Sequence, residues 1–264
     1  MQFIVQGYPA YAYSGGVAFD PKLPAVVMVH GAAMDHSVWQ WQSRYLANHG
    51  YCVLAPDLPA HGRSPGVVRR SVGELADWVA ALIESAGLAH ACVVGHSMGS
   101  LVALELALRR ADLVRKLALV GTSVPMAVGD AFVAAARDDS PVGFDLEATW
   151  GHARNSLLTA SPVPGTSLHG ASRALNDRAQ AGVLAADLEA CRAYQPSIEK
   201  IRALALPTLV VGGKRDQMTP AKLGAALAAQ IPRATFTLLD AGHSMMSEAP
   251  RALLELLKGF LRGP

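Results

Sequence analysis

The sequence has few cysteines, few charged residues and no long apolar run. Cys52, Cys92 and Cys191 are the only cysteines in 264 residues and share no short spacing, so a disulfide framework is excluded and a reducing cytoplasm is expected. The longest uncharged apolar runs, such as 203–213, are well short of the roughly 18 residues that a membrane span needs. Residues 1–16 lack the basic start and apolar block of a secretory signal.

Charge is also too sparse and too evenly spread to indicate a polyanionic partner. Charged residues make up 17% of the chain, and its formal net charge is +2. Dispersed lysine and arginine give no basic stripe, so we expect neither a nucleic-acid partner nor a membrane partner. Hydrophobic residues, in contrast, make up 51% of the chain, which excludes a disordered protein and supplies a sizeable core.

Short apolar runs alternate with segments of helical periodicity. Continuous apolar runs are typical of strands that are buried on both faces of a parallel sheet. Between them, apolar residues of 72–86 recur at helical spacing, with Gly87 as a stop signal, and 98–108 is apolar almost all round. This alternation predicts an α/β fold with a mostly parallel, doubly wound sheet. The predicted strands are 25–29, 52–55, 91–95, 117–121, 208–213 and 235–239.

One long segment interrupts this alternation. Residues 124–202 contain no clear strand, but helix-like blocks occur at 129–138, 144–152 and 182–194, with a Ser-Pro-Val-Pro-Gly stretch at 161–165. We interpret 124–202 as a helical cap inserted between two strands of one core domain, which comprises 1–123 and 203–264. The sequence leaves open which of Met126, His152 and His169 faces a pocket.

The strongest chemical motif is Gly-His-Ser-Met-Gly at 95–99, between a predicted strand and a predicted helix. A sharp strand-to-helix turn strains the central residue, and small residues two before and two after it prevent collisions with neighbouring chain. We therefore expect Ser97 to stand at the helix N-terminus as a nucleophile, where amides and the helix dipole favour negative charge. The alternative is a buried serine in an ordinary tight turn.

A serine nucleophile needs a base within hydrogen-bond reach, and nine histidines compete for that role. His243 is favoured because it follows the last apolar run and precedes a terminal helix. Asp216 follows the run at 208–213, so both side chains would emerge at the C-terminal ends of consecutive parallel strands. Asp216 would then hold the imidazole tautomer. Its alternative is a solvated carboxylate beside Lys214 and Arg215, whereas Asp240 lies too close to His243 to face its ring.

Acyl transfer also needs hydrogen-bond donors for the oxyanion. One donor is expected to be the backbone N–H of Met98, next to the nucleophile, and the second that of Ala32, in the loop after the first buried strand. The sequence has no Cys-x-x-Cys or His-Glu-x-x-His pattern for a metal and no nucleotide-binding glycine loop. We therefore predict no cofactor and no metal.

Together, His30-Gly31, the elbow at Ser97, and Asp216 and His243 in the order nucleophile, acid, base resemble the α/β-hydrolase family, in its lid-bearing esterase and lactonase branch. The resemblance covers nearly the whole chain, including the motif at 57–64, where Ala60 replaces the glycine that many members have. It implies an acyl pocket between a lid and the sheet. Serine at position 97 points away from the dehalogenases and epoxide hydrolases of this fold, which have aspartate there.

The leading hypothesis is a serine hydrolase that cleaves small carboxylic esters or lactones through an acyl-enzyme. Carbon–carbon bond hydrolases and cofactor-free haloperoxidases use the same triad and remain alternatives. A third alternative is a small-ligand sensor, in which the lid moves on binding and presents a surface to a partner protein. The fold alone does not choose among these functions, and the natural substrate and the oligomeric state remain open.

Overall fold

The computed structural model describes residues 1–138, 141–158, 161–162 and 165–263. Within these residues the strands form one eight-stranded sheet in the order β1-β2-β4-β3-β5-β6-β7-β8. The first two strands, β1 (Gln2–Val5) and β2 (Tyr8–Tyr13), pair antiparallel, and β2 also runs antiparallel to β4 (Cys52–Pro56). The other strands are parallel, so the chain has the predicted α/β architecture.

The parallel strands match the predicted apolar runs closely. They are β3 (Ala25–Val29), β4, β5 (Ala91–His96), β6 (Val114–Val120), β7 (Thr208–Gly213) and β8 (Ala234–Leu239). One prediction about them is wrong, because β8 is not buried on both faces. It is one of the two edge strands of the sheet, and Leu238 is 44% exposed.

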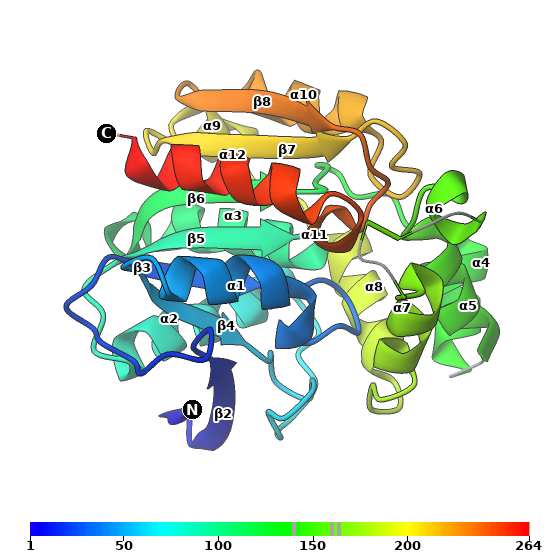
Figure 1. Cartoon of the computed structure of the whole chain (residues 1–264), viewed down its shortest axis with the longest axis horizontal. Helices are drawn as coiled ribbons and strands as arrows, with labels where there is room; N and C mark the ends of the chain where they lie inside the picture. The colour runs from blue at the N-terminus through cyan, green and yellow to red at the C-terminus, as the bar shows by residue number, and fades with distance from the viewer. Residues whose placement is uncertain (139–140, 159–160, 163–164, 264) are drawn as a thin grey trace.

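Helices cover both faces of the sheet. In Figure 1, α1 (Gln40–Ala47) and α12 (Pro250–Arg262) lie in front of it, and α2 (Val72–Ser85), α3 (Met98–Arg109) and α10 (Ala221–Ala228) lie behind. Two apolar clusters fill the layers between helices and sheet. The predicted helix at 72–86 begins where Ser71 Oγ accepts from the Glu74 amide, and Gly87 follows it with φ of 68°.

The chain between β6 and β7 is helical. It contains α4 (Asp130–Arg137), α5 (Pro141–Trp150), α6 (Arg154–Leu158), α7 (Leu168–Asn176), α8 (Val183–Ala193) and α9 (Ile198–Arg202). Three of these, α6, α7 and α9, were not predicted from the sequence. The Ser-Pro-Val-Pro-Gly stretch lies partly outside the described residues, at 163–164. In Figure 1, α4 to α8 stand at the end of the sheet toward which the parallel strands point.

Short helices complete the described part of the chain: η1 (His36–Trp39), η2 (Ala111–Leu113) and α11 (Met245–Glu248). None of the helices in the described ranges combines the length and the apolar character that crossing a bilayer requires.

The C-terminal ends of β3, β5, β7 and β8 lead into loops that face the inserted helices, and the candidate site lies there.

Candidate active site

Ser97 occupies a strained turn between β5 and α3. Its backbone has φ of 52° and ψ of −121°, a region that residues other than glycine rarely adopt. A Cβ atom at Gly95 would collide with the carbonyl oxygen of Gly99, and one at Gly99 would collide with the carbonyl oxygens of Val29 and His30. The two glycines therefore let β3, β5 and α3 approach closely enough to hold Ser97 in this conformation, as the motif predicted.

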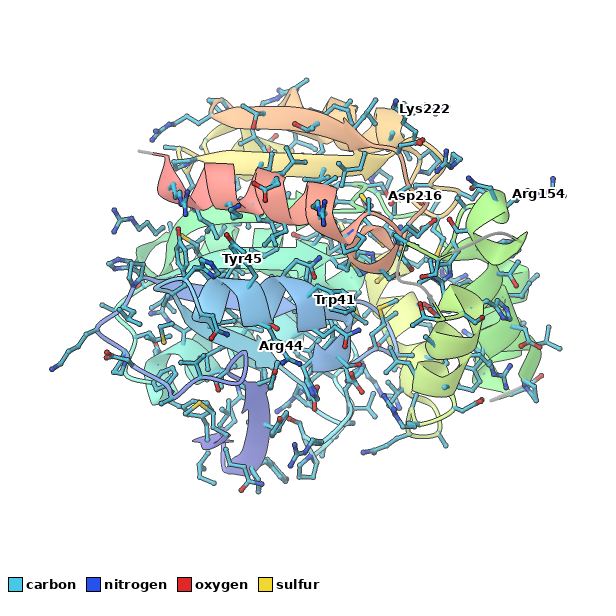
Figure 2. All side chains as sticks on the ribbon, viewed as in Figure 1. Trp41, Arg44, Tyr45, Arg154, Asp216 and Lys222 are labelled. Carbon is cyan, nitrogen blue, oxygen red and sulfur yellow. The ribbon has the colours of Figure 1, made fainter. Side chains whose placement is uncertain are left out.

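His243 and Asp216 form a buried hydrogen-bonded pair. The Nδ1 atom of His243 lies 2.8 Å from Asp216 Oδ2, and both residues are at least nine-tenths buried. Asp216 also accepts hydrogen bonds from the amides of Met218 and Thr219 and from the Thr219 hydroxyl, at 2.7–2.9 Å. Figure 2 labels Asp216 at the end of the sheet that faces the inserted helices. The structure thus brings together two residues that are 27 positions apart in the chain.

The electrostatics of the pair match its geometry. Burial alone would raise the pKa of Asp216, but the charge of His243 and the surrounding hydrogen bonds outweigh burial and lower it. Burial alone would lower the pKa of His243, but the charge and hydrogen bond of Asp216 outweigh burial and raise it. Since Nδ1 of His243 is hydrogen-bonded to Asp216, Nε2 is the ring nitrogen left to act as a base, and it has no hydrogen-bond partner among the described residues.

The competing acid and histidines have other partners. Asp240 is exposed and accepts a 2.6 Å hydrogen bond from Arg215, so the guanidinium beside Asp216 is directed elsewhere. His30 accepts from the Leu58 amide through Nε2, and burial lowers its pKa to about 4. His96 donates from Nε2 to the His243 carbonyl oxygen at 3.0 Å, and burial lowers its pKa to about 3. Both are therefore neutral structural groups.

A cavity of about 190 Å³ opens above Ser97 and His243. Its walls are mostly apolar and come largely from α4, α5, α8 and the loops after β6 and β7. Met126 lines it, whereas His152 and His169 do not, which answers the question that the sequence left open. The lining residues are Ala32, Met34, Ser97, Met126, Ala127, Val128, Gly129, Phe132, Glu147, Trp150, Leu188, Cys191, Gln217, Met218, Thr219 and His243.

The two predicted oxyanion donors lie beside Ser97. Ala32 lines the cavity, and a Cβ atom at the preceding Gly31 would come within 3.2 Å of the Ser97 Cβ, so this loop packs directly on the elbow. Met98 is the first residue of α3 and is fully buried. Their role as donors stays a prediction, since it concerns an anion that forms only during reaction.

Sequence reasoning missed several residues of the cavity. Thr219 had a usable signal, because a threonine three positions after an aspartate can bond to its carboxylate within one turn. Glu147, Trp150 and Cys191 gave no local signal, since their position in the cavity depends on how α5 and α8 are rotated against the sheet.

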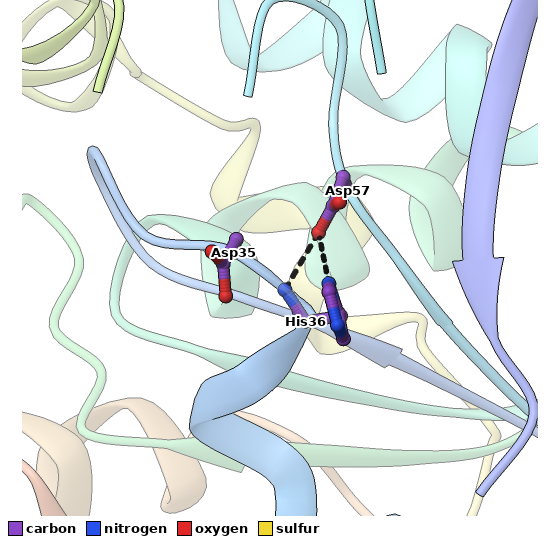
Figure 3. A group of neighbouring side chains, drawn as sticks. All are labelled: Asp35, His36 and Asp57. Carbon is purple, nitrogen blue, oxygen red and sulfur yellow. Dashed lines mark hydrogen bonds and ion pairs between the residues drawn. The ribbon is translucent and has the colours of Figure 1, made fainter. Parts of the chain in front are cut away.

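Figure 3 shows a second polar group, Asp35, His36 and Asp57, whose ligand-type atoms lie close enough together to suggest a metal site. Hydrogen bonds already account for their oxygens. Asp57 accepts from the amide and Nδ1 of His36 through Oδ1, both at 2.7 Å, and from the Arg63 amide through Oδ2. Asp35 accepts from the Ser37 amide and from Arg178. The group therefore ties the loops after β3 and β4 together.

A buried ion pair joins the core to the inserted helices. His61 lies in the loop after β4, and its Nε2 atom is 2.8 Å from Asp187 Oδ2 on α8. Its Nδ1 atom donates to the Pro59 carbonyl oxygen. The same Asp187 oxygen accepts from the amide of Ala33, a residue with φ of 51° in the loop that carries Ala32. Burial would lower the pKa of His61, but the charge of Asp187 and the hydrogen bonds to Asp187 and Pro59 together outweigh burial and raise it. A protonated His61 satisfies both of its acceptors.

Replacing Asp187 with alanine is expected to lower the free energy of unfolding by about 3 kcal/mol, because it leaves a buried cation and the Ala33 amide without their acceptor. A raised histidine pKa stabilises the fold below the unfolded value of about 6.5, and this contribution is lost as pH rises through the folded pKa. Urea unfolding at pH 6 should therefore show the largest effect.

The matched control is Asp130→Ala, which removes an exposed aspartate paired with Arg192 in the same helical segment. It should change stability little, because exposed pairs are screened by water. If both variants unfolded at the same urea concentration, the buried pair would have no special structural role.

Comparisons with known proteins identify the family of this chain. Residues 26–256 match the model of the family described as "Alpha/beta hydrolase family". The chain is 33% identical, over 96% of its length, to the dihydrolipoyllysine-residue acetyltransferase component of an acetoin cleaving system from Cupriavidus necator, of which it spans 66%. It is 25% identical to 3-oxoadipate enol-lactonase 1 from Acinetobacter baylyi, covering 90% of this chain and 89% of that one.

The fold is also found in solved structures. The enol-lactonase from Burkholderia xenovorans LB400 superposes with a TM-score of 0.87 at 22% identity, and all of both chains is covered. At this identity the likeness establishes the fold and no finer property. The family match, by contrast, covers most of the sequence. This chain therefore belongs to the alpha/beta hydrolase family.

Proposed function

We propose that this protein is a serine hydrolase that cleaves small carboxylic esters or lactones through an acyl-enzyme. The observation that carries the proposal is the buried His243, which is held by Asp216 at Nδ1 and has a free Nε2 in a cavity that Ser97 also lines. A neutral imidazole in this position can take the serine proton, and the carboxylate stabilises the imidazolium that forms. The strained elbow presents the hydroxyl at the N-terminus of α3.

In the proposed reaction, Ser97 Oγ attacks the carbonyl carbon while His243 Nε2 removes its proton. The amides of Ala32 and Met98 donate to the oxyanion. As the tetrahedral intermediate collapses, His243 returns the proton to the leaving alkoxide, which departs as an alcohol, and the acyl group stays on Ser97. Water then attacks the acyl-enzyme with His243 as base, and the acid is released. Residues 124–202 act as the cap over a core made of 1–123 and 203–264.

A second candidate is acyl transfer to an acceptor other than water, favoured by the 33% identity to a relative named as an acetyltransferase component. Both reactions pass through the same acyl-enzyme and differ only in the second step. Analysis of the products formed with and without an added alcohol or thiol separates them. Free acid alone supports hydrolysis, and a new ester or thioester supports transfer.

An activity-based probe tests the nucleophile. A small fluorophosphonate is expected to modify Ser97 with a stoichiometry near one, because its phosphorus mimics the carbonyl carbon and its oxygen the oxyanion. Peptide mapping by mass spectrometry identifies the labelled residue. Protein unfolded in urea should not be labelled, since the reactivity comes from the assembled site. Labelling of another residue, or none in the folded protein, would contradict the proposal.

A further inference from the structure

The proposed reaction uses no acid of the cavity wall, yet the cavity contains one. Glu147, on α5, is 4% exposed and lines the same cavity as Ser97 and His243. The other lining residues are mostly apolar, and no lysine or arginine lines the cavity among the described residues. A substrate in this cavity therefore meets one acid, and among the described lining residues His243 alone can carry a positive charge.

Glu147 is held in place from a neighbouring helix. The buried Asn176, on α7, donates from Nδ2 to Glu147 Oε2, so the carboxyl is used as an acceptor. A carboxylate offers about four acceptor positions, and Asn176 occupies one of them. Burial raises the pKa of Glu147, and the hydrogen bond from Asn176 and the charge of His243 offset that rise only in part. The side chain is thus fixed in orientation and retains acceptor capacity.

The neighbouring acid on the same helix shows that this placement is specific. Asp145 is exposed and pairs with Arg173, whereas Glu147, two positions later, faces inward. A buried carboxyl without a cationic partner is costly unless something donates to it. A ligand ammonium would stabilise the ionised form of Glu147 and lower this cost. A ligand carboxylate would disfavour that form further and would meet no lysine or arginine in the cavity wall among the described residues.

We infer that Glu147 determines specificity, so that the cavity selects esters whose chain carries a hydrogen-bond donor, an ammonium group above all, and rejects esters whose chain ends in a carboxylate. This inference rests on the proposed hydrolase function and adds a substrate class to it. Glu147 binds the distal group of the substrate, while Ser97 attacks the carbonyl with His243 as its base and Asp216 holds His243 in place.

The test uses three p-nitrophenyl esters with the same six-carbon acyl chain: hexanoate, 6-aminohexanoate and the half ester of adipate. Each kcat/KM is divided by the rate constant of the ester's hydroxide-catalysed hydrolysis, which removes differences in intrinsic reactivity. In the parent protein, the corrected value for the ammonium ester should exceed that for the carboxylate ester by about tenfold or more, since like charges at close range are strongly disfavoured.

Glu147→Gln keeps the size of the side chain and an acceptor for Asn176 but removes the charge, so the ammonium-to-carboxylate ratio should fall to within about threefold of unity. Glu147→Leu should give the same loss of selectivity, which protects the test if one variant does not fold. The control is Glu189→Gln, on α8, which makes the same charge change outside the cavity, where Glu189 pairs with Arg137. It should keep the parental ratio.

The outcomes are distinct. A parental ratio at or below one overturns the inference, and so does a high ratio that both Glu147 variants retain. Hydrolysis of hexanoate with no selectivity contradicts only the role of Glu147. Failure to hydrolyse any of the three esters, together with the absence of phosphonate labelling, overturns the proposed function and this inference with it.

Discussion

Replacing Ser97 with alanine is expected to lower kcat for a short p-nitrophenyl ester by several powers of ten, up to about 10⁶-fold. Alanine removes the only atom that attacks the carbonyl in the proposed reaction, while the cavity and the oxyanion donors remain. The backbone strain at φ of 52° is the same for both residues, because both carry a Cβ atom. The melting temperature should therefore stay near that of the parent protein.

Two measurements make this result specific. Steady-state hydrolysis gives kcat, and thermal unfolding shows that the variant is folded. Ser85→Ala is a matched control, since Ser85 is an exposed serine at the end of α2 whose hydroxyl donates to backbone carbonyl oxygens. It should hydrolyse the ester at the parental rate. A Ser97→Ala protein that is folded and retains parental turnover would rule out the acyl-enzyme mechanism.

Replacing Asp216 with asparagine is expected to lower kcat by about 10⁴-fold. Asp216 accepts hydrogen bonds from two amides, one hydroxyl and the His243 ring, and it donates none. The amide nitrogen of asparagine cannot accept, so at least one of these donors would face another donor. The imidazole would then rotate or adopt the other tautomer, and the base would be misplaced.

The pH profile of the same variant provides a second readout. Catalysis needs neutral His243, and Asp216 raises the pKa of His243, so kcat/KM of the parent should rise with pH through a midpoint above the ordinary value of about 6.5. Without the carboxylate charge, the midpoint should move to lower pH. Asp240→Asn is the control, because Asp240 is exposed and pairs with Arg215. If Asp240→Asn lost activity and Asp216→Asn kept it, the acid would be misassigned.

Local sequence patterns predicted most of the sheet and its main helices. The strands at 25–29 and 208–213 have the predicted bounds, because a continuous apolar run between turn residues carries its own signal. The position of β8 at the sheet edge could not be predicted in this way. Strand order depends on contacts between distant segments, and the apolar residues at 235–239 look the same in a central strand and in an edge strand.

The inserted helices were harder to predict than the sheet. The α7 segment, Leu168–Asn176, buries only two of its nine residues and contains glycine and serine, which favour helices poorly, so its helix was not predicted. The motif at 95–99 predicted the conformation of Ser97. The position of Asp216 after β7 predicted that its side chain would meet His243. Asp145 and Glu147 lie on the same helix, and only the packing of α5 shows which of the two acids faces the cavity.

The positions of the motif at 95–99 differ in how far they tolerate a change of side chain. A methyl group at 95 or 99 would push against main-chain carbonyls, which cannot move aside as a flexible side chain can. Position 97 faces open space in the cavity, so its side chain can be exchanged for another small one while the backbone stays as it is. Descendants of this chain could therefore acquire a different nucleophile by a single substitution at position 97. Glycine is expected to persist at 95 and 99 even in a descendant that has lost catalytic activity.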